Sequence, residues 1–297
     1  MMLQEPYLPE GFEAFWEDTV READLADLDY SRSAQSEVSR DGFQIDLIDF
    51  KGVNGDLLHG WFAFPTDAMM TPGFVWLAPY GRSSMTPNEY GTRAGFCSLS
   101  FNYFGEPAFH EEEYEPSRGY FAEGIGSPET WVFRRMFQDS VIAARVLAEL
   151  EETNAQRIGA MGMSQGGGIA VWMGAMCRQV KAVCADLPFC AARPVVFSRK
   201  IKRYPLKELF DWWGDDTGKR KAAMDTMAFF DTVNLATECK VPTLVTVGLK
   251  DPAVKPFEVS SVYEALAGEK RLDEIDGGHD WHESMLERNR EWLAEHL

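Results

Sequence analysis

Positive charge is scarce in this chain, which has 29 Lys and Arg against 47 Asp and Glu and a formal net charge of −18. A surface of that sign repels nucleic acids and anionic membranes, so we expect neither as a partner. Long hydrophobic runs are also missing, which argues against a membrane-spanning helix. Residues 1–25 have neither the basic start nor the apolar core of a signal peptide. These absences predict a soluble, cytoplasmic protein, with the alternative that an export signal was removed from the chain.

Cysteine is rare as well, with five residues in 297. The count is odd, no two cysteines form a Cys-x-x-Cys pair, and several lie in apolar runs. Buried free thiols in a reducing compartment therefore fit better than a disulfide framework. The same spacing argues against zinc, and no metal or other cofactor is expected. The five are Cys97, Cys177, Cys184, Cys190 and Cys239.

Apolar residues, in contrast, make up 45% of the chain, which is enough for a sizeable core. Continuous apolar runs predict strands at 73–78 and 95–101. Further strands are predicted at 180–186, 241–247 and 270–275, with helical patterns between most of the strands. This alternation predicts an α/β fold with a mostly parallel, doubly wound sheet and helices on both faces.

Other segments add to this framework. An amphipathic helix is predicted at 9–25, and two strands at 43–48 and 57–64 should pair antiparallel across an Asn-Gly turn. A long helix is predicted to open at Ser127, which would cap it. Residues 188–240 interrupt the alternation of strands and helices, and their sequence predicts helices. We expect a single domain over residues 1–297, with 188–240 as a helical insertion or lid above the carboxyl edge of the sheet.

The most informative segment is Gly162-Met163-Ser164-Gln165-Gly166, which follows an apolar run and precedes a helix rich in small residues. In that context the Gly-x-Ser-x-Gly pattern is typical of the nucleophile elbow of an α/β-hydrolase. The glycines on both sides of the serine remove collisions at a strained turn. The alternative is a helix N-terminus that Ser164 merely caps.

A serine nucleophile needs a base, and five histidines are available. His279 follows two glycines directly after the last predicted strand, where this fold places its base. His282 would begin the next helix and is the weaker candidate. The remaining three lie in an early strand, an acidic loop and the terminal helix: His59, His110 and His296.

The histidine in turn needs an acid that fixes its tautomer. In this fold the acid lies between serine and histidine in the sequence. Asp251 follows an apolar strand at the expected place, although an aspartate before a proline is also a common turn residue. Asp186 and Asp276 also end strands and rank below it, Asp186 as the possible substitute.

Acyl transfer also requires donors for the developing oxyanion. The N–H of Gln165, at the start of the elbow helix, is one candidate. The N–H of Tyr80 is the second, in the loop 79–82, where Gly81 would allow close approach; a plain strand-to-helix turn is the alternative for that loop. Aromatic side chains of the insertion are candidates for the substrate pocket or for a packed lid core: Phe189, Trp212 and Trp213.

At this point the chain resembles the acetyl xylan esterase and cephalosporin C deacetylase family of carbohydrate esterases. The elbow of that family, Gly-x-Ser-Gln-Gly-Gly, is matched by 162–167, and its later Gly-Leu-x-Asp and Gly-His segments are matched by 248–251 and 278–279. Further similar segments are 12–16, 118–125, 186–189 and 230–234. Together they span nearly the whole chain.

The resemblance implies an esterase that releases acetate from small acetylated sugars. It implies a triad of Ser164, Asp251 and His279, an oxyanion pocket from the amides of Tyr80 and Gln165, and often a ring-shaped homo-oligomer. One departure is plain, because the usual Arg-Gly-Gln triplet is replaced by Asn-Tyr-Phe-Gly at 102–105, and the loop 83–94 looks short. A peptidase or another carboxylesterase on the same fold, and a non-catalytic binding protein, stay open as alternatives.

Overall fold

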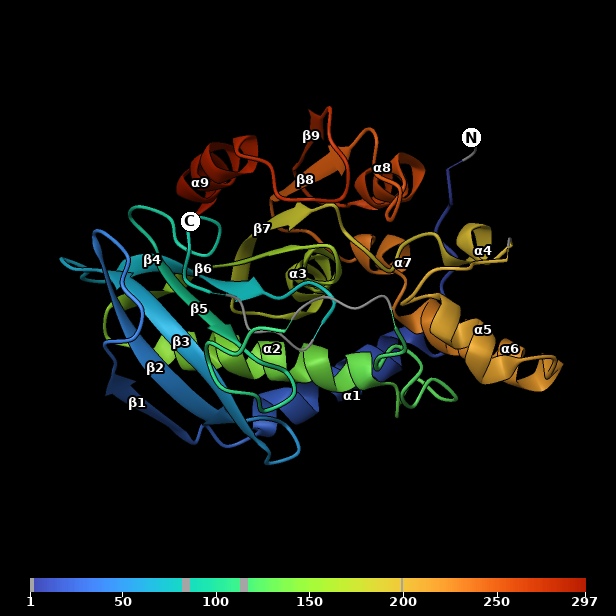
Figure 1. The fold of residues 1–297 in the computed structure, drawn as a ribbon, viewed down its shortest axis with the longest axis horizontal. Coiled ribbons are helices and arrows are strands. Elements are labelled where there is room, and N and C mark those ends of the chain that lie inside the picture. Colours follow the sequence, from blue (N-terminus) through green and yellow to red (C-terminus); the bar gives the residue numbers. More distant parts are fainter. Residues whose placement is uncertain (1–2, 82–85, 113–116, 199) are drawn as a thin grey trace.

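The computed structural model describes residues 3–81, 86–112, 117–198 and 200–297, and its centre is one nine-stranded sheet (Figure 1). The strands are β1 Tyr30–Ala34, β2 Phe43–Lys51, β3 Leu57–Pro65, β4 Thr71–Leu77, β5 Cys97–Phe101, β6 Thr153–Met163, β7 Val180–Asp186, β8 Thr243–Gly248 and β9 Lys270–Ile275. The helices are α1 Phe12–Leu25, α2 Val132–Glu149, α3 Gln165–Met176, α4 Arg193–Val196, α5 Lys207–Trp213, α6 Thr217–Phe229, α7 Thr232–Ala236, α8 Pro256–Ala265 and α9 Ser284–His296.

The strand order is β1-β2-β3-β5-β4-β6-β7-β8-β9. From β5 to β9 all neighbours are parallel, whereas β1, β2, β3 and β5 pair antiparallel. The predicted hairpin is confirmed, with Phe43 opposite Pro65 and Lys51 opposite Leu57. The chain leaves β4 towards β5 on one side and returns to β6 on the other. Such a reversal opens a crevice at the carboxyl ends of the strands, which is where open α/β sheets bind ligands.

Helices cover both faces of the sheet, and the apolar side chains of β4 are buried on both of these faces. Its side chains alternate between two cores, because successive strand residues point to opposite faces. Val75 and Leu77 join the larger core with α1, α2, α3 and α8, whereas Phe74 and Trp76 join a smaller core beneath α9. The continuous apolar run therefore follows from burial on both faces, and the predicted doubly wound sheet is confirmed.

The long helix begins later than predicted. We expected Ser127 to cap it, but α2 starts at Val132, and residues 127–131 form turns in which the Trp131 N–H donates to the Ser127 carbonyl. The Ser127 hydroxyl accepts the N–H of Glu129 and so caps this turn. The Trp131 indole donates to the Phe121 carbonyl at 2.7 Å, which anchors the chain where the helix starts. Ser127 therefore caps the turn that precedes the helix, and not the helix itself.

The insertion at 188–240 is helical, as expected, and contains α4 to α7. Figure 1 shows α5 and α6 projecting from the body of the molecule, while α7 lies close to α3 and α8. Its role as a lid, and the division into one domain with an insertion, stay predictions. Among the described residues, no helix is both long and apolar enough to cross a bilayer.

All five cysteines are buried and free, as predicted. Burial raises the pKa of each thiol, for Cys97 to about 12 and for Cys177 to about 11. A thiol with such a pKa stays protonated at neutral pH and is a weak nucleophile. The cysteines therefore act as small core side chains.

One buried carboxyl ties the β2–β3 hairpin to α2. The Val53 N–H donates to Asp139 Oδ1 at 2.8 Å, and a Cβ at Gly52 would lie 2.6 Å from the same oxygen, so only glycine allows this approach. Burial raises the pKa of Asp139 from 3.8 to about 7. Because the folded state holds this proton more tightly than the unfolded state, the contribution of Asp139 to stability is lost as the pH rises towards 7.

Asp139→Asn removes that titration and keeps an oxygen acceptor for Val53. The free energy of unfolding of the variant, relative to wild type, should therefore grow by about 2 kcal/mol between pH 5.5 and pH 8. Urea denaturation at both pH values measures it. The control is Asp225→Asn, which removes an exposed carboxylate on α6. A difference from wild type that stays constant with pH would contradict this account of Asp139.

Candidate active site

Ser164 occupies the sharp turn between β6 and α3. Its φ is 57° and its ψ −117°, a conformation that side-chain-bearing residues rarely adopt. The Ser164 N–H donates to the Asp186 carbonyl at 2.8 Å, and the Ser164 carbonyl accepts the Phe189 N–H at 2.9 Å. Hydrogen bonds to the last residue of β7 and to the segment after it thus hold the strained turn in place. The structure has the predicted strand, turn and helix around this serine.

The glycines of the elbow leave room for backbone alone. A Cβ at Gly166 would lie 2.1 Å from the Leu77 carbonyl oxygen at the end of β4, and one at Gly162 would lie 2.6 Å from the Gly166 carbonyl carbon. A Cβ at Gly167 would meet the Asp186 carbonyl oxygen at 2.7 Å. Backbone atoms cannot move aside as a flexible side chain can. The spacing Gly-x-Ser-x-Gly-Gly is therefore a consequence of where β4 and β7 pass the elbow.

His279 lies in the loop after β9, and Asp251 in the loop after β8. His279 Nε2 lies 2.9 Å from Ser164 Oγ, and His279 Nδ1 lies 2.7 Å from Asp251 Oδ2. The two loops are fastened together, because the Lys250 N–H donates to the Gly277 carbonyl at 2.9 Å. A Cβ at Gly248 would lie 2.8 Å from the Gly278 carbonyl oxygen, so this approach also requires a glycine. Three separate segments thus meet at one point.

The environment of these groups suits proton transfer. The Asp251 side chain is fully buried, and its Oδ1 accepts the N–H groups of Ala253 and Val254 at 2.7 and 2.9 Å. An ionised carboxylate only accepts hydrogen bonds, so it favours the imidazole with its proton on Nδ1. The unprotonated Nε2 then faces the serine hydroxyl. The arrangement can remove the hydroxyl proton as the oxygen attacks a carbonyl group.

The competing residues do not reach this point. His282 is exposed and bonds to the Ser284 hydroxyl at 2.8 Å. Asp186 is buried, and its carboxylate accepts hydrogen bonds from Thr246 and Asn289 at 2.6 and 2.8 Å. Its pKa is raised by burial. Asp276 is exposed and pairs with Lys250. The structure brings Asp251, and none of these alternatives, to His279.

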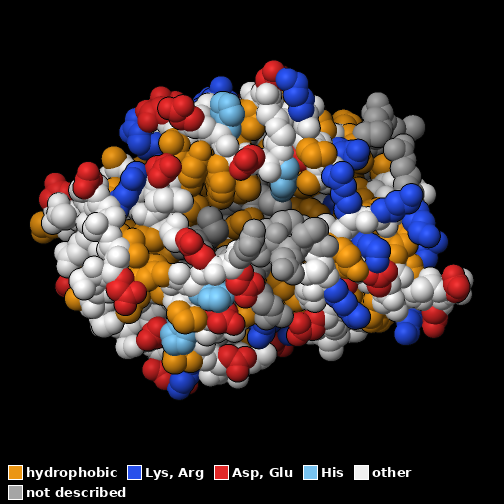
Figure 2. Space-filling view, in the orientation of Figure 1, with side chains coloured by type: hydrophobic (Ala, Val, Ile, Leu, Met, Phe, Trp, Pro, Cys, Tyr) orange, Lys and Arg blue, Asp and Glu red, His pale blue; other side chains and the backbone are white. Residues whose placement is uncertain are grey.

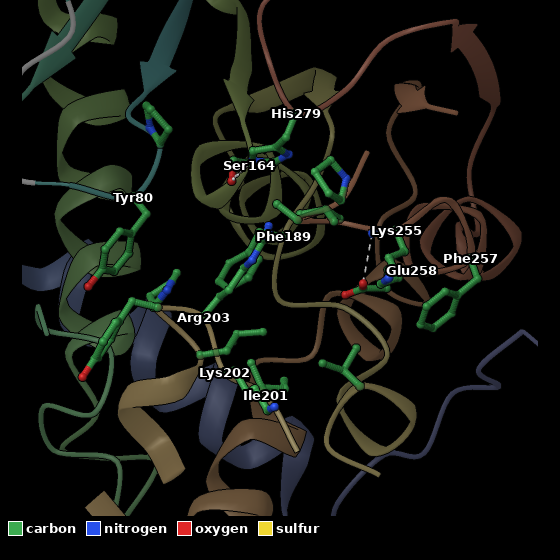
Figure 3. A pocket seen from close by; sticks show the side chains of 18 of the residues that line it. Tyr80, Ser164, Phe189, Ile201, Lys202, Arg203, Lys255, Phe257, Glu258 and His279 are labelled. Atoms are coloured by element: carbon green, nitrogen blue, oxygen red, sulfur yellow. Dashed lines mark hydrogen bonds between the residues drawn. The ribbon is translucent and has the colours of Figure 1, made fainter. Parts of the chain in front are cut away.

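Ser164 and His279 open into a cavity of about 810 Å³ (Figure 3). Phe189, one of the three predicted pocket aromatics, lines it, but Trp212 and Trp213 do not. Trp213 is buried against Phe197 and Phe210 within the insertion, at ring distances of 5.8 and 4.7 Å. The Trp212 ring lies under Lys219, whose Nζ is 5.4 Å from it. We correct the prediction for both tryptophans, since the insertion uses Trp213 for a core of its own.

Residues 3–296 match the model of the acetyl xylan esterase family. The chain belongs to that family. Acetyl esterase Axe7A of Xylanibacter ruminicola is 23% identical over 287 residues; the match covers 90% of this chain and spans only 63% of that protein's length.

Two solved structures share the fold over almost the whole of both chains. An acetyl xylan esterase from Paenibacillus sp. R4 has a TM-score of 0.87 and 23% identity, and covers 99% of this chain and 97% of its own. Acetyl xylan esterase 1 from Thermoanaerobacterium sp. JW/SL YS485 has a TM-score of 0.85 and 20% identity, and covers 99% and 95%. The fold is that of the α/β-hydrolases, as predicted.

In this member of the acetyl xylan esterase family, Tyr120 joins the two segments that carry the predicted oxyanion donors, the loop after β4 and the start of α3. Its hydroxyl accepts the Gly81 N–H at 3.0 Å and donates to Gln165 Oε1 at 3.0 Å. Its ring stacks on that of Tyr80, with centroids 4.6 Å apart. Burial raises the pKa of Tyr120, which keeps the hydroxyl protonated as a donor. The amides of Tyr80 and Gln165 stay a prediction, and Arg82 lies outside the described residues.

The departure from the family triplet has a structural counterpart. Phe104 packs on Tyr120 with ring centroids 4.6 Å apart, and the Tyr103 hydroxyl and Ser140 Oγ lie 3.0 Å apart in the core. The Asn102 side chain accepts the Phe104 N–H at 2.9 Å. An aromatic stack of Phe104, Tyr120 and Tyr80 thus stands beside the elbow. Of the loop that looked short, residues 83–85 lie outside the described part of the chain.

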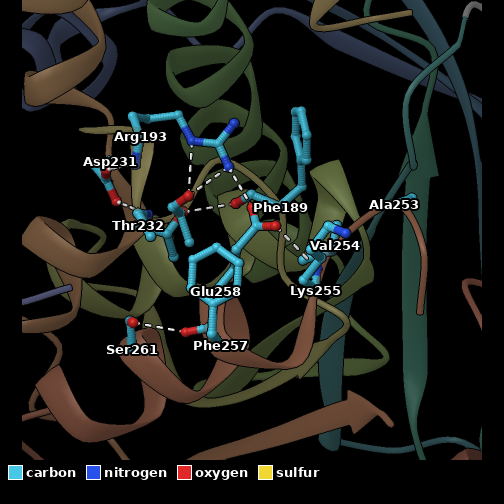
Figure 4. Close-up of polar contacts among 12 residues, drawn as sticks. Phe189, Arg193, Asp231, Thr232, Ala253, Val254, Lys255, Phe257, Glu258 and Ser261 are labelled. Atoms are coloured by element: carbon cyan, nitrogen blue, oxygen red, sulfur yellow. Dashed lines mark hydrogen bonds and ion pairs between the residues drawn. The ribbon is translucent and has the colours of Figure 1, made fainter. Parts of the chain in front are cut away.

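A buried ion pair supports the part of the cavity wall that is formed by Phe189 and Glu258 (Figure 4). Arg193 Nη2 lies 3.0 Å from Glu258 Oε2, and the guanidinium lies over the Phe189 ring at 5.1 Å. Glu258 Oε1 accepts the Lys255 N–H at 3.0 Å. Burial raises the pKa of Glu258, and Arg193 opposes that rise. The pair fastens α4, at the start of the insertion, to the first turn of α8. Sequence patterns did not single it out, because the partners are 65 residues apart.

Gly166→Ala forces a methyl group against the β4 backbone. We expect it to lower the free energy of unfolding by about 1–3 kcal/mol or more, as overpacking does in a rigid core. Urea denaturation measures the loss. Gly126→Ala is the matched control, because its Cβ would meet no atom closer than 3.8 Å. Equal stability of the two variants would refute the steric account of the elbow.

Arg193→Met leaves the Glu258 carboxylate buried without its cation, which should cost about 3–5 kcal/mol of stability. Adding Glu258→Gln should recover part of this loss, because the second change removes the unpaired charge. A double-mutant cycle in urea measures the coupling. Arg290→Met, at an exposed pair with Glu287, serves as control and should cost below about 1 kcal/mol. Additive losses at Arg193 and Glu258 would contradict the coupling.

Proposed function

We propose that this protein is a serine esterase that removes acetyl groups from small acetylated sugars or xylo-oligosaccharides. The observation that carries the proposal is the pair of contacts made by His279, 2.9 Å from the Ser164 hydroxyl oxygen and 2.7 Å from the Asp251 carboxylate. Membership of the acetyl xylan esterase family supports the acetyl group and the sugar. The fold alone would leave the leaving group undefined, since it carries many chemistries.

In the first half of the reaction, Ser164 Oγ attacks the ester carbonyl carbon while its proton passes to His279 Nε2. Asp251 stabilises the imidazolium that forms. The negative charge on the carbonyl oxygen would be held by the N–H groups of Tyr80 and Gln165. His279 then gives the proton to the departing alcohol oxygen as its bond to the acyl carbon breaks. An acetyl group stays on Ser164.

In the second half, water takes the place of the alcohol. His279 removes a proton from the water as its oxygen attacks the acetyl carbon, and returns that proton to Ser164 Oγ as the acyl–oxygen bond breaks. Acetate leaves and the free serine is restored. The transfers between Ser164 Oγ and His279 Nε2 use groups that are already in hydrogen-bond contact, 2.9 Å apart. A cytoplasmic location and a homo-oligomer stay predictions beside this proposal.

Ser164→Ala removes the nucleophile, and Asp251→Asn removes the charge that orients His279. We expect acetate release from acetylated xylo-oligosaccharides to fall by about 10⁴-fold or more in each variant, measured as kcat. Asp276→Asn is the matched control: its carboxylate follows β9 as that of Asp251 follows β8, but it is exposed, so the change should leave the rate near that of the wild type.

The same assays with longer acyl esters and peptide amides distinguish the other readings. Wild-type activity on peptide amides above that on acetyl esters would make the protein a peptidase. Unchanged rates in Ser164→Ala would refute the triad. If the wild-type protein hydrolysed no ester, the non-catalytic binding protein would be the reading that is left.

A further inference from the structure

Cationic side chains line the cavity that contains Ser164. They come from two separate segments, one in the insertion before α5 and one at the start of α8. The four are Lys200, Lys202, Arg203 and Lys255. Figure 3 shows Lys202 and Arg203 across the cavity from Ser164 and His279, and Lys255 on a separate flank. The cations therefore face the same space as the serine.

These charges have little to neutralise them. Glu258 is the one acidic residue among the described residues that line the cavity, and its carboxylate is already paired with Arg193. In the described part of the chain, no salt bridge joins any of the four cations to an acid: the ion pairs of the structure lie elsewhere. The cavity therefore carries a net positive charge.

That sign opposes the rest of the molecule. The chain as a whole has a net charge of −18, so an arbitrary part of its surface is more often acidic than basic. Figure 2 shows Lys and Arg side chains gathered on the right of the central hollow, with Asp and Glu prominent on its other side. A cleft of one sign between low-dielectric walls focuses the field and concentrates ions of the opposite charge. Apolar lining residues provide such walls here: Val195, Val196, Ile201, Leu206 and Phe257.

We propose that the natural substrate is an acetyl ester whose alcohol part bears an anionic group, a carboxylate or a phosphate. The inference rests on the esterase function proposed above. An acetyl group has no room for a charge, so the anion must belong to the alcohol. With its ester carbonyl at Ser164, such a substrate extends its alcohol part into the cavity towards Lys202, Arg203 and Lys255. An O-acetylated uronic acid, or a short oligosaccharide that contains one, has this chemistry.

The test compares esters that differ mainly in charge: 4-acetoxybenzoate, its neutral methyl ester and 4-acetoxyphenyl phosphate. For each, kcat/KM is divided by the rate constant for hydroxide hydrolysis of the same ester, which removes differences in intrinsic reactivity. We expect the wild-type protein to favour the anionic esters at low salt by at least about fivefold, the effect of one cation near 4 Å in water. The preference should shrink as sodium chloride is added. The corrected kcat/KM values of 4-acetoxybenzoate and 4-acetoxyphenyl phosphate show which of the two anions, carboxylate or phosphate, the protein prefers.

Lys202→Gln and Lys255→Gln remove one charge each from different walls. Each should reduce the ratio of anionic to neutral ester hydrolysis by about fivefold, mostly through KM. Lys240→Gln is the control: it removes one charge from an exposed side chain outside the cavity and should leave the ratio unchanged. An acetylated methyl glucuronoside and its methyl ester repeat the comparison on a sugar.

The outcomes separate the two proposals. Hydrolysis of all esters without preference for the anions, or equal ratios in Lys202→Gln, Lys255→Gln and Lys240→Gln, overturns the anionic substrate and leaves the esterase function intact. Failure to hydrolyse any acetyl ester, neutral or charged, overturns the esterase function, and the inference falls with it.

Discussion

The backbone of β4 passes so close to Gly166 that no side chain could stand there, and this crossing fixes Ser164 in its strained turn. Because β4 and β7 flank β6, their carboxyl ends hold the turn from both sides. The next strands, β8 and β9, end at the same edge and carry Asp251 and His279. Parallel strands thus convert three distant parts of the chain into one site.

The cavity in front of that site is built from two kinds of support. On one side, the rings of Phe104, Tyr120 and Tyr80 stand beside the elbow. On the other, the buried pair of Arg193 and Glu258 joins the insertion to α8 and leaves no net charge of its own. Apart from Glu258, the charged side chains among the described residues that line the cavity are Lys200, Lys202, Arg203 and Lys255, and they share it with Ser164 and His279.

Local patterns in the sequence predicted the elbow, His279 and Asp251, because glycine spacing and strand ends are local signals. The sheet followed from apolar runs buried on two faces. The features that the sequence did not predict depend on contacts between residues far apart in the chain. The edge strand β1 lacks apolar alternation and is held by Arg32, which pairs with acids of β2 and of the α2–β6 turn. The sequence shows that Trp213 is aromatic, but it does not show whether the ring points into the substrate cavity or into the insertion's own core. Tyr120 bridges Gly81 and Gln165, and that contact arises only when the fold brings these two segments together.

The convergence of Ser164, His279 and Asp251 is tested most directly by covalent labelling. The protein is incubated with diethyl 4-nitrophenyl phosphate, digested, and mapped by mass spectrometry. The account predicts a single modified residue, Ser164, with label incorporation that matches the loss of esterase activity. Absence of labelling, or a label on another serine at equal rate, would show that the imidazole does not activate the hydroxyl at the elbow.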